Sequence, residues 1–455
     1  MSKHVENKRV VPRLRFPEFG IAEEWRVESF GDLYAYKSTN SFSRDNLTYD
    51  SGLVKDIHYG DIHTKFSTLF DITREKVPYI KSSVSIDRIK LENYCIEGDM
   101  IFADASEDLY DVGKSIEVVF LNNERLLSGL HTLLARQKAP KLVLGFGGYL
   151  FMSDGIRAQI RRESQGAKVL GISSARLSDI SIYYPESKEE QRKIVDCLSS
   201  MDEIVNAQYL KLDALKAHKR GLMQQLFPNN NEGVPTLRFP QYQSAGEWIW
   251  DSLGDYSTKV GSGITPAGGN KNYTKEGRPF VRSQNIGWGV LLLDDIAFIN
   301  EQTHATFLGS EIEKDDVLLN ITGASIGRCA LADARIIGGN VNQHVCIIRT
   351  KSNLNPFFLA QYLISEGGQK QIWSFQAGGN RQGLNYVQIR SFSIPIPPDY
   401  DEQGKIAECL FSIDEMIIAQ TEKIDILRAQ KNGLAQHLFP SITIKTNEQR
   451  DTTVC

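Results

Sequence analysis

The chain has 455 residues, 41% of them hydrophobic and 24% charged, so we expect a globular protein of two to four domains. Its net charge of −4 is unfavourable for a stand-alone nucleic-acid binder, because phosphate neutralisation is the main source of such affinity. No apolar run approaches the ~18 residues of a membrane span, and the first residues lack the apolar stretch of a signal peptide. We therefore expect a cytoplasmic protein, and its six cysteines, none in a C-x-x-C pair, argue against a disulfide framework or zinc cage.

A lead-in segment near the start of the chain occurs twice. Residues 11–33 read VPRLRFPEFGIAEEWRVESFGDL and residues 234–256 read VPTLRFPQYQSAGEWIWDSLGDY, with twelve of 23 positions identical. Arg15 and Arg238 recur in this repeat, which favours a structural or partner-facing role over sequence reading. A duplication of whole domains at a period of ~210 residues is too long for a solenoid, whose repeats run ~20–50 residues.

Each lead-in is followed by a large domain with strand-like and glycine-rich patterning. Equivalent segments are recognisable in the two domains, and we expect one helix over residues 355–371. The paired segments are 91–103 with 309–320, 111–115 with 322–328, 128–136 with 340–349 and 166–182 with 378–394. This mixture of short strands, glycine turns and a few helices predicts an α/β (α+β) domain of irregular topology.

Each large domain is followed by a stretch with an apolar 3–4 rhythm, residues 187–228 and 399–440. This spacing predicts two long helices, each with an apolar seam that seeks a partner helix. Polar interruptions fall at matching places, Gln208 with Gln420 and Lys219 with Lys431, which favours mutual packing in one register. A helix of about 39 residues is roughly 58 Å long, or about 17 base pairs. The expected seam comprises Ile194, Leu198, Met201, Leu212, Leu215, Leu222, Ile406, Leu410, Ile413, Ile424, Leu427 and Leu434.

The predicted architecture is therefore two domains of mixed α/β fold, separated by two long antiparallel coiled-coil-like helices, with a pseudo-two-fold internal repeat. Separate amphipathic helices, each packed on its own domain, are the alternative. The expected order is a lead-in (1–24), first domain (25–186), central helix (187–228), linker with second lead-in (229–247), second domain (248–398), distal helix (399–440) and flexible tail (441–455).

Catalytic motifs are weak in this sequence. Residues 355–358 (NPFF) lack the second proline of the N-P-P-[FY] loop of adenine methyltransferases, and residues 145–148 (GFGG) match a cofactor loop poorly, so we interpret them as a helix start and a turn. No P-loop is present, and His58, His63, His131 and His344 lack metal-ligand spacing. The acidic run Asp99, Asp104, Glu107, Asp108 and Asp111 has no counterpart near Asp316 and is interpreted as a solvated loop.

Over residues 11–440 the chain resembles the specificity (S) subunit of type I restriction–modification systems. Each motif is weak alone, but their order, repeated twice at near-constant spacing, is specific. The first domain departs from the pattern, with ADASEDLYDVGKS and SGLH in place of TGASIG and NQHV. The motifs are LRFP…W (14–25 and 237–248), ITPAGGNKNY near Ile264, TGASIG, NQHV, a G-x-x-x-x-G before IPIPP, E-Q-x-K-I (190–194 and 402–406) and L-x-Q-x-L-F-P (222–228 and 434–440).

The resemblance implies a non-catalytic reader of double-stranded DNA. Each large domain would be a target-recognition domain for one half of a split, asymmetric site, and the long helices would set the spacer and dock two methyltransferase (M) subunits. Other subunits would use S-adenosylmethionine, ATP and Mg²⁺, including the motor-nuclease (R) subunits, while this chain would bind neither cofactor nor metal. A scaffold that joins two copies of a partner without binding DNA is the alternative.

Base readout needs Arg, Lys, Asn, Gln or hydroxyl side chains on exposed loops or strands. In the second domain the richest stretch is residues 278–288, RPFVRSQNIGW. Taken singly, each candidate is more easily a solvated surface residue, but as clusters on glycine-rich loops they favour DNA contact. The candidates are Lys55, His58, Tyr59, Lys65, Arg161, Arg162, Lys168, Arg282, Gln284, Asn285, Asn342, Gln343, His344, Asn380, Arg381 and Gln382.

Overall fold

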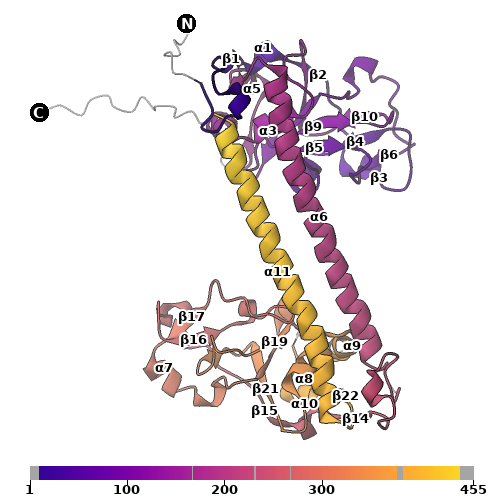
Figure 1. Cartoon of the computed structure of the whole chain (residues 1–455), viewed down its shortest axis with the longest axis vertical. Helices are drawn as coiled ribbons and strands as arrows, with labels where there is room; N and C mark the ends of the chain where they lie inside the picture. The colour runs from indigo at the N-terminus through magenta and orange to yellow at the C-terminus, as the bar shows by residue number, and fades with distance from the viewer. Residues whose placement is uncertain (1–9, 167, 230–231, 267, 377–382, 441–455) are drawn as a thin grey trace, which may run out of the picture. The chain divides into compact units, whose positions relative to one another are not determined.

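The structure is a computed structural model that describes residues 10–166, 168–229, 232–266, 268–376 and 383–440. It divides into two compact units, residues 1–207 with 424–455 (unit 1) and residues 208–423 (unit 2) (Figure 1). Each unit contains one large domain and one end of each long helix. Residues 1–9 of the expected lead-in and the expected tail 441–455 lie outside the described residues.

Unit 1 has a five-stranded sheet in the order β2-β11-β7-β9-β5 and a four-stranded sheet in the order β10-β4-β6-β3. Two further pairs, β1 with β13 and β12 with β8, are antiparallel. Its elements are β1 (Arg26–Ser29), α1 (Phe30–Leu33), β2 (Tyr34–Lys37), β3 (Leu47–Thr48), β4 (Lys55–Ile57), α2 (Tyr59–Thr64), β5 (Leu69–Asp71), β6 (Tyr79–Ile80), β7 (Met100–Ala103), β8 (Ala105–Ser106), β9 (Ser115–Phe120), β10 (Leu126–Ser128), β11 (Thr132–Gln137), α3 (Phe146–Met152), α4 (Asp154–Glu163), β12 (Leu170–Gly171), α5 (Ser174–Ser178) and β13 (Ser181–Tyr184).

Unit 2 repeats this plan with fewer strands, in the orders β15-β21-β18-β19, β17-β16-β20 and β14-β22. The parallel pair β16–β20 matches the parallel pair β4–β10 of unit 1. Its elements are β14 (Ile249–Ser252), β15 (Ser257–Ser262), β16 (Arg278–Val281), β17 (Ala297–Ile299), α7 (Glu301–Ala305), β18 (Val317–Asn320), β19 (Cys329–Leu331), β20 (Asn340–Val341), β21 (Val345–Thr350), α8 (Pro356–Ile364), α9 (Glu366–Ser374), α10 (Tyr386–Arg390) and β22 (Ser393–Ile396).

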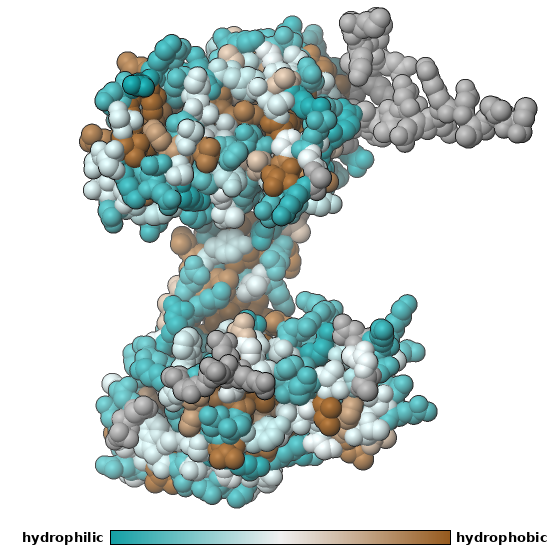
Figure 2. All heavy atoms as spheres, turned by 180° about the vertical axis from the view of Figure 1, so that it is seen from behind, coloured by the Kyte–Doolittle hydropathy of each residue, from teal (hydrophilic) through white to brown (hydrophobic). Residues whose placement is uncertain are grey.

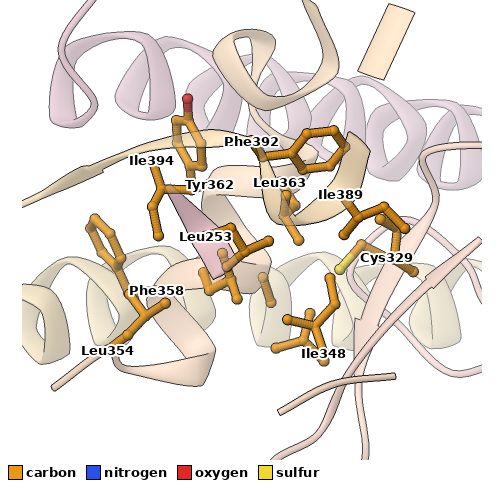
Figure 3. Close-up of a cluster of buried hydrophobic side chains, with 14 of the residues drawn as sticks. Leu253, Cys329, Ile348, Leu354, Phe358, Tyr362, Leu363, Ile389, Phe392 and Ile394 are labelled. Carbon is orange, nitrogen blue, oxygen red and sulfur yellow. The ribbon is translucent and has the colours of Figure 1, made fainter. Parts of the chain in front are cut away.

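The core of each unit lies between its larger sheet, its short helices and the long helices. In unit 2, Phe358 and Tyr362 of α8 pack with Leu253, Ile348 and Phe392 (Figure 3). The same cluster takes in Ile406 and Leu410 at the start of the last long helix, and Met223 and Leu226 at the end of the first. The helix ends are therefore part of the domain core, which explains their apolar seams.

The long helices are α6 (Lys188–Leu226) and α11 (Tyr400–Leu438), of 39 residues each. Within each unit the end of one runs beside the start of the other, so the pair is antiparallel and the predicted fold class is confirmed (Figure 1). All twelve expected seam residues are buried or half-buried. The polar seam positions pair across the two helices: Gln420 donates to Gln208, Lys219 binds Asp414, and Lys431 binds Asp202.

Two local predictions need correction. The helix expected over residues 355–371 is two helices, because Ser365 ends α8 and caps α9 by accepting the amide of Gly368. The stretch 145–148, expected as a turn, starts α3 instead, with Gly145 at φ 88° before it. Only glycine adopts this left-handed conformation readily, so GFGG serves as a sharp helix entry.

The two units share equivalent contacts between the lead-in segment, the large domain and the long helix. Arg15 forms a buried bidentate ion pair with Glu190, and Arg238 forms the same pair with Glu402. These pairs fasten the lead-in segment to the first turn of the long helix, which gives the recurring arginines a structural role. The next residues repeat as well: Gln191 accepts the amide of Val143, and Gln403 accepts that of Asn355.

Exposed apolar side chains occur on the long helices as well as on the large domains. In Figure 2 hydrophilic residues cover most of the visible face of each unit, and hydrophobic residues gather along the helices. Exposed apolar side chains there include Ile204 and Leu210 on α6 and Met416, Ile418 and Ile426 on α11. Across the described helices, none is long and apolar enough to cross a membrane.

Candidate nucleic-acid interface

In each unit three loops lie next to one another, and the two sets of loops occupy equivalent positions of the fold. In unit 1 the amide of Gly129 donates to Ile57 O, and that of Asp104 donates to His131 O. In unit 2 the amide of Asn342 donates to Val281 O, and that of Ile321 donates to His344 O. These bonds align residues 58–61, 104–106 and 129–131 with residues 282–285, 321–323 and 342–344. We call each set of three segments the loop cluster of its unit.

The loop cluster of unit 2 carries a chain of hydrogen-bonded polar side chains. Thr265 bonds to Gln343, Gln343 to His344, and the other ring nitrogen of His344 to Thr322. Gln343 is exposed and His344 half-buried, whereas Asn342 is buried and accepts the amide of His344. The predicted group 342–344 therefore presents Gln343 and His344 outward, with Asn342 holding the turn beneath them.

Another part of the same cluster combines Arg282 and Gln284 around one carboxylate. Arg282 donates to Asp295 at 2.7 Å, and Gln284 donates to the second carboxylate oxygen at 2.6 Å. Asn285 is 1% exposed; it accepts the amide of Arg282 and donates to Leu292 O. The hydrogen-bonding groups of Asn285 are used inside the protein, and the Arg282 side chain is only 18% exposed and held by Asp295. Gln284 is therefore the residue of this stretch that is exposed to an external ligand.

In unit 1 the loop cluster is aromatic and rich in histidine. The ring of Tyr59 packs against His58, His63 and His131, with centroids 4.6 to 6.0 Å apart. His131 is exposed and lies 3.3 Å from Asp104, while His58 is buried and accepts the amide of Gly60. Burial, followed by the nearby Arg44 charge, lowers the pKa of His58, which favours a neutral ring. His344 occupies in unit 2 the place of His131.

Basic side chains flank this cluster. Arg44 and Lys65 both bind the fully buried carboxylate of Asp61, at 2.8 Å, and each cation remains 44% to 47% exposed. One buried anion thus fixes two cations at the surface, leaving an excess positive charge. Lys55 differs, because it is buried in β4 and paired with Glu124 at 2.7 Å. Lys65 is therefore displayed toward solvent, and Lys55 is not.

The remaining unit 1 candidates lie at the end of α4 and in the following loop. Arg161 is half-buried with its guanidinium over the ring of Tyr110, and Arg162 and Lys168 are exposed. Pairing of β12 with β8 brings this loop beside residues 105–106 of the loop cluster. The corresponding candidates of unit 2, Asn380, Arg381 and Gln382, lie outside the described residues.

Three features of the clusters were not predicted. Arg44 and Tyr110 stand in stretches without a motif, so only the fold brings them to the site. The acidic run is not one solvated loop: Asp99 is fully buried and paired with Arg136 at 2.7 Å. Asp316 pairs likewise with Arg349, so this part of the run does have a counterpart.

The described residues include no group of three or more His, Cys, Asp or Glu side chains placed to hold a metal ion.

One duplicated frame that carries two different loop clusters defines a two-module recognition protein. Residues 253–428 match the family model described as the type I restriction modification DNA specificity domain. The chain is 25% identical over 438 residues to a putative type I restriction enzyme MjaX specificity subunit of Methanocaldococcus jannaschii, across 94% of this chain and 95% of that one. It is 22% identical over 458 residues to the MjaVIII specificity subunit of the same organism, across 97% of each chain.

Among solved structures, the fold is similar to that of a type I restriction–modification S subunit from M. genitalium. The TM-score is 0.55 at 15% identity, and the match covers 95% of this chain and 100% of that chain. Residues 253–428 thus match a DNA specificity domain, and nearly the whole chain is similar to type I restriction enzyme specificity subunits. Each of these relatives is named as the specificity subunit of a restriction enzyme.

Proposed function

We propose that this chain reads a bipartite DNA site for a type I restriction–modification complex, one half through each unit. The observation that carries the proposal is the pair of loop clusters, which occupy equivalent places yet present different side chains. Gln284, Gln343 and His344 face outward in unit 2, whereas Tyr59, Lys65 and His131 do so in unit 1. Two unlike surfaces on one frame are suited to two unlike half-sites.

The net charge of −4 is then less unfavourable, because partners contribute phosphate contacts. We infer that two M subunits dock on the long helices, and the exposed apolar side chains there support this assignment. Ile204 of α6 and Met416 of α11 occupy equivalent helix positions and are 45% and 48% exposed. Equivalent patches would receive equivalent partners, which matches two copies of one subunit.

The chemistry would belong to the other subunits. M subunits would use S-adenosylmethionine to methylate adenine, and R subunits would use ATP and Mg²⁺ for translocation and cleavage. This chain would supply position: it would bind the double-stranded site in the cytoplasm and hold the M subunits at a fixed separation on it. The separation would be set by α6 and α11, which are equally long.

The decisive experiment exchanges residues 248–398 for the corresponding domain of another specificity subunit. The hybrid is co-expressed with the M subunit of its own system, and methylated adenines are mapped across a genome. We expect one half of the methylated motif to change, while the other half and the spacer stay the same. A hybrid that changes both halves or neither would contradict the modular reading. Methylation that is unchanged when the chain is omitted would favour a scaffold without DNA recognition.

A further inference from the structure

Tyr110 and Trp373 are the two most exposed aromatic side chains of the described residues, at 75% and 72%. Tyr110 lies in the loop between β8 and β9 of unit 1, and Trp373 lies in the last turn of α9 in unit 2. Such a high exposure of a large ring leaves apolar surface in water, so a pair of such residues calls for an explanation. Their placement in the duplicated frame supplies one.

The helices α4 and α9 are counterparts in the two units. Gln159 of α4 bonds to both the amide and the carbonyl of Ser181, and Gln371 of α9 makes the same two bonds to Ser393. This alignment makes Arg161 the counterpart of Trp373. The guanidinium of Arg161 lies 5.6 Å from the ring centre of Tyr110, so the Tyr110 ring lies beside the side chain whose position in unit 2 is taken by Trp373.

In each unit the exposed ring lies on the side of α4 or α9 that faces the loop cluster. One turn before Trp373, Gln369 donates to Gly327 O at 2.9 Å, at the end of the loop that carries Thr322. Residues four apart share a helix face, so Trp373 lies on the side of α9 that meets this loop. In unit 1, Arg157 stands one turn before Arg161 and donates to Val112 O and Tyr110 O.

The exposed ring comes from a different element in each unit: from a loop in unit 1 and from a helix in unit 2. Gly113 donates to Ala103 O, and Gly327 donates to Asn320 O, so these glycines mark the same loop end. Between each glycine and the strand that ends with its acceptor, β7 in unit 1 and β18 in unit 2, there are nine residues (104–112) and six residues (321–326), respectively. The longer loop brings its own ring, Tyr110, over a helix that has arginine; the shorter loop has no ring, and the helix itself supplies Trp373.

We propose that Tyr110 and Trp373 are DNA-contacting residues that pack their rings against the duplex at the border of each half-site. The inference rests on the proposed function and adds a residue class to it. Apolar side chains contact thymine methyl groups and wedge at base steps, and aromatic stacking tolerates many sequences. Arg161 adds a positive charge beside Tyr110, which favours a phosphate nearby. A protein partner is the competing occupant, but both rings lie beside the loop clusters proposed to read DNA and not on α6 or α11, where the M subunits are proposed to dock.

The test uses the complete complex with its M subunit and a duplex carrying the methylated motif mapped for the unaltered chain. Binding is measured by fluorescence anisotropy at one salt concentration. We expect Tyr110→Ala and Trp373→Ala each to weaken binding about 5- to 100-fold, the range found when stacked aromatics are truncated. Trp373→Tyr should retain most of the affinity. Phe120→Ala is the matched control, since its ring is exposed and lies away from the loop clusters and the long helices, and we expect less than a twofold change.

Locality is tested by scrambling one half-site at a time. The loss of affinity caused by Trp373→Ala should shrink to below about twofold when the half-site of unit 2 is scrambled. It should persist when the half-site of unit 1 is scrambled. Tyr110→Ala should show the reverse pattern. Unchanged affinity in either variant overturns the shared assignment. So does reduced co-purification of the M subunit, which would make the rings protein contacts. If the unaltered complex does not distinguish the mapped duplex from the scrambled ones, the proposed function itself fails.

Discussion

Lys219 of α6 lies 2.7 Å from both carboxylate oxygens of Asp414 of α11, and both side chains are nearly buried. The counterparts at the same 212-residue spacing, Lys431 and Asp202, form the same ion pair in unit 1. A third partner is conserved in position only: Gln361 donates to Asp414, and Tyr149 donates to Asp202. The domain, the first helix and the second helix thus meet at one carboxylate in each unit.

The two ion pairs differ in exposure, which predicts different energies. Asp414 is 12% exposed, whereas Asp202 is 42% exposed. We expect Asp414→Ala to lower the free energy of unfolding by about 3–5 kcal/mol, because it leaves a buried ammonium without a partner. Asp202→Ala should cost about 0–1 kcal/mol, as for exposed pairs. Urea denaturation followed by fluorescence measures both.

A compensating variant separates lost charge from lost packing. Lys219→Met combined with Asp414→Leu removes both charges and keeps most of the volume, so most of the lost stability should return. Equal losses for Asp414→Ala and Asp202→Ala would show that burial does not govern the energy of this contact.

Unit 1 contains two buried acids that predict a dependence of stability on pH. Burial raises the pKa of Glu117 from 4.5 to about 7, against the lowering effect of the amides of Gly148 and Gly145. Burial also raises the pKa of Asp56 to about 7. A carboxyl group with a raised pKa in the folded state contributes stability that is complete below its unfolded pKa. That contribution is lost as the pH rises through 7.

We therefore expect unit 1 to be more stable at pH 5 than at pH 8, by on the order of 3 kcal/mol for each group. Unit 2 has Leu331 and Phe280 at the corresponding strand positions, so the effect should be confined to unit 1. Glu117→Gln should remove roughly half of the difference in unfolding free energy between pH 5 and pH 8. The control is Glu107→Gln, at an exposed acid, which should leave the difference unchanged.

Neighbouring residues in the unit 2 loop cluster have opposite expected roles. Gln284→Ala removes an exposed side chain, so stability should change by less than about 0.5 kcal/mol while recognition of one half-site weakens. Asn285→Ala leaves Leu292 O and the amide of Arg282 without partners, at a cost of about 1–3 kcal/mol. Thermal unfolding and methylation mapping distinguish the two, and a stable Asn285→Ala protein with an altered motif would reverse the assignment.

The repeats in the sequence were sufficient to predict the fold class, since apolar rhythm and matched polar positions specify a helix pair. Gln208 and Gln420 pair with each other as their matching positions suggested. Lys219 does not pair with Lys431, because like charges repel and each finds an aspartate of the other helix. The partner Asp414 lies one position from the seam residue Ile413 and carries no signal of its own.

The residues of the candidate site were harder to predict from the sequence than the fold class, for a physical reason. Residue type predicts hydrogen-bonding capacity but not burial, and Lys55, Asn285 and Asn342 are buried polar residues that hold loops in place. Conversely, Arg44 and Tyr110 come from stretches without a motif and reach the site through Asp61 and Arg157. Such placements depend on contacts between segments far apart in the chain, which spacing within one segment does not encode.

The antiparallel pairing changes how the spacer should be engineered. An insertion of four residues in α6 after Ala207 separates Gln208 and Lys219 from the contacts made nearer the start of the helix. Without a matching insertion after Ala419 in α11, the two sets of helix contacts fall out of register, so the α6 insertion alone should destabilise the protein. The matched double insertion should fold, with each helix longer by about 6 Å and rotated by about 40°.

On DNA this change corresponds to between one and two base pairs at 3.4 Å per step. The matched variant should therefore methylate a motif with both halves unaltered and a spacer longer by about one or two base pairs. The single insertion in α11 is the second control and should behave like that in α6. Co-expression with the M subunit and genome-wide methylation mapping gives the motif directly. A stable double-insertion protein that keeps the original spacer would contradict the assignment of α6 and α11 as the element that sets the separation of the half-sites.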